Sequence, residues 1–199
     1  MPPKVKVTKE ELIDAAFQIA ADEGIDAVTV RKVARRIGCS VAPIYVNFET
    51  SEDLIRAVFE RAEDISFEYM NGDYSESPFL NMGIGIIMFA RAYNHLFRDV
   101  LLKKSRFAPI EGFGDKKYIE LMKRDQLVKG LDDDELFNIL FKLDIFTHGL
   151  ALLVSDENNK DLLSEEKIIS ILRETGYDII LSAQLRKKGE YPHDECDNC

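Results

Sequence analysis

The chain has 199 residues, of which 46% are hydrophobic and 31% charged, a composition typical of a globular protein with enough apolar side chains for a core. With 26 Lys and Arg against 36 Asp and Glu, its formal net charge is -10, which argues against a nucleic acid or an anionic membrane as partner of the chain as a whole. The first residues lack an apolar signal core, and the longest apolar run, 82–90, is far shorter than the ~20 residues that span a bilayer. Three cysteines make no disulfide framework, so we expect a cytoplasmic protein.

The charge is unevenly distributed along the chain. Residues 27–48 hold no Asp or Glu but four basic side chains, which are Arg31, Lys32, Arg35 and Arg36. Residues 1–48 carry 7 basic and 6 acidic side chains, whereas residues 49–199 carry 19 and 30. The chain therefore combines an acidic body with a locally basic segment near its start, and that segment remains a candidate for binding nucleic acid.

Helical periodicity runs along nearly the whole chain, and no segment alternates as a strand does, so we predict an all-α fold of about nine helices. Thr8 caps the first helix, with Glu11 completing a capping box, and Gly24 ends it. Thr29 caps a second helix that ends at Gly38, where a new segment begins.

A short third helix follows after only three residues, 38–40, and Ser40 is placed to cap it. A three-residue turn that contains Gly between two short helices predicts a helix-turn-helix. The apolar residues that we assign to the core of these helices are Val33, Ala34, Ile44 and Phe48.

Further helices are predicted beyond this unit. Their expected ranges are a fourth helix from 50 or 51 to about 70, and then 79–97, 99–106, 115–128, 132–154 and 164–187. Acidic residues open the last two helices and basic residues close the final one, as the helix macrodipole favours.

The segment from Thr29 to Leu54 resembles the TetR family of bacterial transcriptional regulators, and the similarity extends over about residues 8–58. The matching pieces are "AAFQIAADEG", the Thr that opens the second helix, "VA..IG" and "IY..F...EDL". The resemblance implies a helix-turn-helix DNA-binding domain over 1–49, a helical regulatory and dimerisation domain over 50–189 and an acidic tail over 190–199. It also implies a homodimer that binds a pseudo-palindromic DNA operator, usually as a repressor, and is released by a small effector.

The resemblance and the side-chain chemistry together give a set of DNA-binding candidates. Arg31 is the preferred base reader, because a guanidinium pairs well with guanine. Family phosphate-contact positions are occupied by Thr29, Ser40, Tyr45 and Asn47, and the third helix presents Val41, Ala42 and Pro43 outward, where they can touch thymine methyl groups. Ser51 stands where the family usually has Lys and brings no charge. Arg35 and Arg36 either contact phosphates or are simply solvated.

The second half of the chain is rich in aromatic residues. Each is either a core residue or part of a pocket between helices. Asp144 and His148 are four residues apart on an otherwise apolar face, and they either orient a ligand or pair with each other. The candidate ligand-binding residues are Phe89, Tyr93, Phe107, Phe113, Phe141, Asp144 and His148. Such a site favours a mostly apolar or aromatic effector.

The helices at 132–154 and 164–187 are the predicted dimerisation helices, by family resemblance and because both are long and amphipathic. Gly149 and Gly176 permit a close approach, either of a partner helix or of a neighbour in the same chain. The family expectation is an isologous interface of two helices from each subunit.

Other functions remain open at this stage. His193, Cys196 and Cys199 have spacings that suggest zinc, or they belong to a frayed tail, so a metal-responsive sensor of the same fold is one alternative. A TetR-like protein with weak or lost DNA binding is another, because Ser51 is uncharged and the third helix is apolar. No nucleophile motif, glycine-rich phosphate loop or HExxH motif is present, so we predict no enzyme activity and no cofactor.

Overall fold

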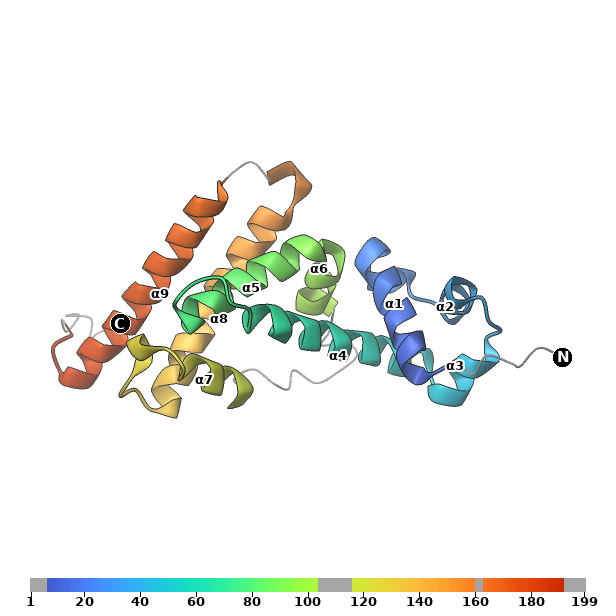
Figure 1. The fold of residues 1–199 in the computed structure, drawn as a ribbon, viewed down its shortest axis with the longest axis horizontal. Coiled ribbons are helices and arrows are strands. Elements are labelled where there is room, and N and C mark those ends of the chain that lie inside the picture. The colour runs from blue at the N-terminus through green and yellow to red at the C-terminus, as the bar shows by residue number, and fades with distance from the viewer. Residues whose placement is uncertain (1–6, 104–115, 160–162, 192–199) are drawn as a thin grey trace, which may run out of the picture. The chain divides into compact units, whose positions relative to one another are not determined.

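The computed structural model describes residues 7–103, 116–159 and 163–191, and within these ranges the regular elements are all helices. The all-α prediction is confirmed (Figure 1). The α-helices are α1 (Lys9–Glu23), α2 (Val30–Ile37), α3 (Ala42–Asn47), α4 (Ser51–Met70), α5 (Pro78–Ala92), α6 (Asn94–Lys103), α7 (Lys116–Met122), α8 (Asp133–Ser155) and α9 (Glu165–Lys188). The chain divides into two compact units, 1–69 with 88–111 and 70–87 with 112–199.

The first two helices begin and end where the sequence predicts. The Thr8 hydroxyl accepts a hydrogen bond from the Glu11 backbone, and the Glu11 carboxylate accepts one from Thr8 N–H, which completes the capping box. Thr29 caps α2 in the same way. Gly24 and Gly38 follow the two helices with positive φ angles of 87° and 78°, which L side chains rarely adopt.

The cap of α3 differs from the prediction, whereas α4 begins at Ser51, within the predicted range. Ser40 does not cap α3, because Val41 occupies the N-cap position and Pro43 lies in the first turn with a φ angle already suited to a helix. At α4, Thr50 and Asp53 form reciprocal hydrogen bonds, and Ser51 is the first helical residue rather than the cap. The hydrogen bonds from Thr50 hold the pKa of Asp53 below its ordinary value.

The predicted continuous helix over 79–97 is wrong, because the structure ends α5 at Ala92 and begins α6 at Asn94. The hydrogen bonds from Tyr93 N–H to the Phe89 carbonyl oxygen and from Phe97 N–H to the Tyr93 carbonyl oxygen persist across the break. Only the helical conformation at Tyr93 itself is interrupted. The Tyr93 ring packs edge-on against Phe17, with 5.3 Å between ring centroids, and this long-range contact is invisible to a local pattern.

Asp99 of α6 ties α6 to the turn that follows α1. Its side chain is only 7% exposed, and its carboxylate accepts a 2.5 Å hydrogen bond from the backbone N–H of Ile25. A Cβ on Gly24 would lie 3.1 Å from the same carboxylate oxygen, so glycine also leaves room for this approach. Helices α1 and α6 pack together in this unit (Figure 1).

The second unit is organised around the packing of α8 against α9. Asp132 and Glu135 form a capping box at the start of α8, and Lys187 near the end of α9 pairs with both carboxylates. Gly176 is buried, and a Cβ there would lie 3.3 Å from the Phe79 ring, so this glycine serves a close contact within the chain. Gly149 has no atom within 4 Å of a Cβ built on it.

Helix α8 is long and apolar enough to cross a membrane by length and composition alone, with a mean hydropathy of 1.5 over its most apolar window. The core helix of a globular protein passes the same test. Here the apolarity has a structural reason, because α8 buries one face that includes Leu136, Leu143 and Leu150 and exposes further apolar side chains elsewhere.

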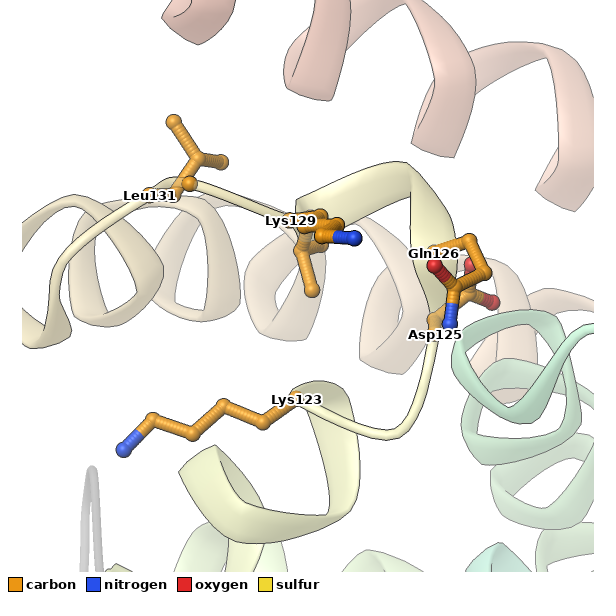
Figure 2. A pocket seen from close by; sticks show the side chains of 7 residues that line it. Lys123, Asp125, Gln126, Lys129 and Leu131 are labelled. Carbon is orange, nitrogen blue, oxygen red and sulfur yellow. The ribbon is translucent and has the colours of Figure 1, made fainter.

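A cleft of about 330 Å³ lies at the connection between α7 and α8 (Figure 2). Its lining residues are Lys123, Asp125, Gln126, Val128, Lys129, Gly130 and Leu131. Asp125 is buried and accepts hydrogen bonds from the Ser77 hydroxyl and from the backbone of Phe79 and Leu127, so it stabilises the loop before α5. None of the predicted ligand-binding residues lines this cleft.

The Asp99–Ile25 hydrogen bond generates the first prediction. Asp99→Ala leaves a buried backbone N–H without this acceptor, which should lower the free energy of unfolding by about 1–3 kcal/mol. Asp99→Asn keeps an acceptor oxygen of similar shape and should lose less. Denaturant unfolding followed by circular dichroism measures both variants, and equal stability of Asp99→Ala and wild type would contradict the assigned role of Asp99.

Candidate nucleic-acid interface

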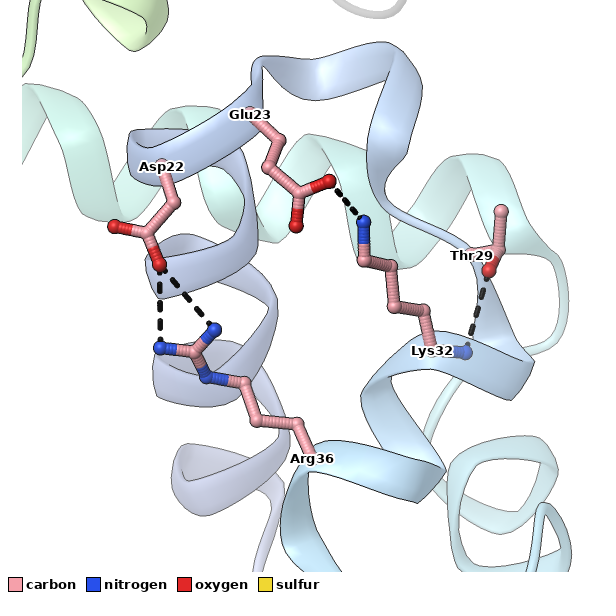
Figure 3. Close-up of polar contacts among 5 residues, drawn as sticks. All are labelled: Asp22, Glu23, Thr29, Lys32 and Arg36. Carbon is pink, nitrogen blue, oxygen red and sulfur yellow. Dashed lines mark hydrogen bonds and ion pairs between the residues drawn. The ribbon is translucent and has the colours of Figure 1, made fainter.

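Two ion pairs join α1 to α2 (Figure 3). Asp22 accepts from the Arg36 guanidinium at 3.3 and 3.4 Å, and Glu23 pairs with the Lys32 ammonium. Both carboxylates lie at the C-terminus of α1, where the macrodipole is unfavourable for negative charge and the last turn holds no basic residue. Lys32 and Arg36 supply the missing positive charge and are thereby partly neutralised.

Arg31 and Arg35 occupy a different face of α2. They are four residues apart, as Lys32 and Arg36 are, so α2 presents two separate pairs of basic side chains. Both arginines are exposed, and neither has an ion pair within the part of the chain that the structure describes. Arg35 is therefore exposed without an ion pair among the described residues, whereas Arg36 is paired, and contact of either with a phosphate stays a prediction.

Helix α3 is held by one face and exposes the other. Ile44 and Phe48 are buried, as are Val33 and Ala34 of α2, so their assignment to the core is confirmed. Val41, Ala42 and Tyr45 are exposed, with Tyr45 62% accessible, and Pro43 is half-buried. The structure therefore places the predicted outward residues on the surface of a helix-turn-helix, while their contact with DNA stays a prediction.

The predicted polar contacts differ in availability. The Thr29 hydroxyl oxygen already accepts from Lys32 N–H, which leaves its O–H to donate. The Asn47 side-chain amide donates to the Pro43 carbonyl oxygen at 2.7 Å and so stabilises α3 itself. Ser40 and Ser51 are both exposed. Thr50, not Ser51, accepts the hydrogen bond from Asp53 N–H at the start of α4.

Val46 is the residue that the sequence analysis missed. It is 83% exposed, more than the other large apolar residues that are exposed in the described chain. A helical wheel would have found it, because Val46 lies two residues after Ile44 and therefore about 200° around the helix from the buried face. The predicted outward residues of this helix stop at Pro43 and Tyr45, and Val46 is assigned to neither face.

The predicted ligand-binding residues are divided between the two units. Phe89 and Tyr93 belong to the first unit, where they pack with Phe17 and Tyr69 in a cluster of rings with centroids 5.3–6.4 Å apart. Phe141, Asp144 and His148 lie on α8 in the second unit. Phe107 and Phe113 fall outside the described residues. A ligand role for this set stays a prediction.

The pairing of Asp144 with His148 is confirmed. The His148 Nδ1 atom lies 3.1 Å from the Asp144 carboxylate and 2.8 Å from the Asp144 carbonyl oxygen. Burial alone would lower the pKa of His148, but the hydrogen bond and the charge of Asp144 outweigh it, so the pKa is raised from 6.5. The pair therefore satisfies itself on α8, which is the structural alternative raised above.

The metal candidates of the tail, His193, Cys196 and Cys199, lie outside the described residues. Within the residues that are described, no group of three or more His, Cys, Asp or Glu side chains is arranged to hold a metal ion. His95 is exposed on α6 in the first unit, whereas His148 is paired on α8 in the second.

The head formed by α1, α2 and α3 is thus a helix-turn-helix module with an exposed helix and two unpaired arginines. Residues 12–58 match the family model for bacterial regulatory proteins of the tetR family. Over these residues the resemblance to this family noted in the sequence is confirmed.

Solved structures share the fold of the chain. A transcriptional regulator from Rhodococcus sp. RHA1 matches 88% of this chain and 97% of its own, at 16% identity and a TM-score of 0.61. A TetR variant from Acinetobacter baumannii, solved with minocycline, matches 92% and 98%, at 17% identity and a TM-score of 0.59. These likenesses show the TetR-type all-α fold.

The matches to curated relatives cover a smaller share of each relative than of this chain. An HTH-type transcriptional repressor of Mycobacterium tuberculosis and an uncharacterized HTH-type transcriptional regulator of Mycobacterium bovis are each 22% identical over 151 residues. Each match covers 74% of this chain but 57% of the relative, so the chain spans little more than half the length of these proteins.

The separation of basic side chains on α2 generates the second prediction. Arg35→Ala should weaken operator binding about tenfold or more, because a charge-assisted contact of roughly 1.5–3 kcal/mol is lost. Arg36→Ala, the matched control on the paired face, should weaken binding less than Arg35→Ala does, because the Asp22 carboxylate already offsets part of the Arg36 charge. Fluorescence anisotropy at a fixed salt concentration measures both, and an equal or larger loss for Arg36→Ala would reverse the assignment.

Proposed function

We propose that this chain is a DNA-binding transcriptional regulator that acts as a homodimer on a pseudo-palindromic operator. The observation that carries the proposal is the surface of the head, where Arg31 and Arg35 of α2 are unpaired and α3 exposes Val41 and Tyr45. Arginines that grip phosphates and a short helix whose outer side chains reach base edges are the two parts that major-groove recognition requires. The family match over residues 12–58 supports the same function.

Repression is the mode of action that we propose, because two of the relatives are named transcriptional repressors. A repressor of this kind needs only to occupy its operator. Release by a small effector would follow if the effector bound the helical domain better in a conformation that no longer fits DNA.

The effector that we propose is mostly apolar or aromatic. The aromatic side chains of the helical part support this chemistry, and one structural neighbour was solved with minocycline, a polycyclic compound. Phe89 is fully packed by neighbouring rings, so Tyr93, which is half-buried at the break between α5 and α6, is the better candidate to meet a ligand from this cluster.

Dimerisation through α8 and α9 is supported by their surfaces. Helix α8 exposes Ile145, which is 61% accessible, and Leu153, with Gly149 halfway between them and open space above its Cα atom. Helix α9 exposes Tyr177 and Leu181. Exposed apolar side chains that recur every four residues on one helix mark an interface rather than a solvated face. A second copy would cover both faces isologously, and Gly149 rather than Gly176 would allow the close approach.

Selection of DNA by the purified full chain tests the proposed function. The protein is incubated with a random duplex library at low salt, bound DNA is recovered and sequenced, and the mass of the resulting complex is measured. The proposal expects a motif with two related half-sites whose centres are separated by one helical turn or a multiple of it, roughly 34–36 Å for one turn, bound by two chains or a multiple of two. No enrichment of any sequence over several rounds would overturn it.

The proposed interface generates a third prediction. Ile145→Glu places a charge in an apolar contact, so the variant should be a monomer at micromolar concentration, as measured by light scattering. Loss of the second head should weaken operator binding by about 10²-fold or more, since two linked half-site contacts reinforce each other.

Met88→Glu is the matched control, because it adds the same charge to an exposed apolar residue on α5, outside α8 and α9. It should remain dimeric. A dimeric Ile145→Glu variant with unimpaired operator binding would place the interface elsewhere.

A further inference from the structure

The outer face of α3 is more apolar than a solvated helix requires. Val46 is 83% exposed, and Ala42, one helical turn before it, is exposed on the same face of this six-residue helix, while Val41 is exposed at its N-cap. The helix packs through Ile44, and Phe48 just beyond it is also buried, so Val46 contributes nothing to the core of the head. An exposed valine on a helix keeps apolar surface in water and does not stabilise the fold, unless a partner covers it.

The surroundings of this face favour nucleic acid as that partner. Residues 27–48 contain no acidic side chain, and the two unpaired arginines of α2, Arg31 and Arg35, precede α3 directly in the helix-turn-helix. An apolar protein partner would gain nothing from these two charges, whereas a DNA duplex binds them through its phosphates. Charge complementarity therefore selects a DNA groove over an apolar protein surface.

The face has little capacity to read bases by hydrogen bonds. An asparagine side chain discriminates adenine by using its amide N–H as donor and its amide oxygen as acceptor at the same time. The Asn47 amide N–H already donates to the Pro43 carbonyl oxygen, so Asn47 is poorly placed for this pairing. Val41, Ala42 and Val46 have no polar side-chain atoms at all. The apolar feature of the major groove is the 5-methyl group of thymine, which valine and alanine contact well.

We propose that α3 reads its operator through thymine 5-methyl groups, with Val46 as the chief specificity-determining residue, Ala42 on the same face and Val41 at the start of the helix. The proposal rests on the proposed function and names the chemistry that the head recognises. Guanine readout by Arg31 on α2 would then be a separate element of the same half-site.

The test uses the operator obtained by selection, in which each thymidine of a half-site is replaced by deoxyuridine, one position at a time. This exchange removes only the methyl group and leaves every hydrogen-bonding atom of the base in place. At one or two positions the wild-type chain should bind about fourfold more weakly, the fold-change that corresponds to roughly 0.8 kcal/mol for a buried CH₂ or methyl group. Symmetric replacement in both half-sites should weaken binding about 16-fold by the same estimate.

Val46→Ala should reduce the difference between the thymidine and deoxyuridine operators at the position that Val46 contacts, because the shorter side chain loses most of its contact with the methyl group. Because Val46 is exposed and alanine favours helices, the variant should keep the unfolding temperature of the wild-type chain, which circular dichroism checks. Arg35→Ala is the matched control, because it should weaken binding to both operators equally and leave their ratio unchanged.

Each outcome separates the two proposals. If selection enriches no sequence, the proposed function fails and this inference fails with it. If an operator is found but no deoxyuridine substitution changes its affinity, thymine-methyl recognition is overturned while the proposed function stands. If Val46→Ala keeps the full thymidine preference, α3 reads methyl groups through another residue and the assignment to Val46 is overturned.

Discussion

The ion pairs between the end of α1 and the near face of α2 decide which positive charges of the head are free. Helix α1 ends in Asp22 and Glu23 against its own macrodipole, and no basic residue in its last turn offsets them. Arg36 and Lys32 do so from α2. Burial of Val33 and Ala34 sets the rotation of α2 about its axis, and the two ion-paired side chains, one turn apart, lie on the side toward α1. Arg31 and Arg35 are then directed elsewhere, and the rest of the proposed DNA surface follows from that rotation.

This arrangement explains how a chain with a formal net charge of -10 can bind DNA. The acidic excess lies in residues 49–199, with 30 acidic and 19 basic side chains, whereas the head is close to neutral and its acids all precede residue 27. A polyanion is therefore attracted only to the α2–α3 surface and repelled by the rest of the chain. With few exposed cations that lack an ion pair in the described head, the proposed dimer would draw its affinity from two heads acting together and from contacts to base edges.

Local signals were enough to predict most of the fold. The caps at Thr8 and Thr29, the glycines at 24 and 38 and the buried residues Ile44 and Phe48 each follow from a few neighbouring residues, and the structure confirms them. Long-range contacts account for what was not predicted. The hydrogen bond from Ile25 to Asp99 spans 74 positions, and the break at Tyr93 accompanies a ring contact with Phe17 in α1. Neither leaves a periodic trace in the sequence.

The sequence predicted most residues of the candidate site but not which of them are paired within the chain. The sequence named the basic residues of α2, yet only the coordinates separate Arg35 from Arg36, because the separating carboxylates come from another helix. Val46 was within reach of the helical period and was missed. The ligand candidates could not be resolved by pattern, since an aromatic residue on an apolar face has the same spacing in a core as in a pocket.

The central claim is that the carboxylates at the end of α1 withhold Lys32 and Arg36 from DNA. Operator affinity of the Asp22→Asn/Glu23→Gln double variant, measured over a range of salt concentrations, tests it most directly. Release of two cations in each head should tighten binding at low salt and steepen the plot of log K against log salt by about 0.9 for each new phosphate contact. An affinity and a slope equal to those of the wild-type chain would contradict the claim.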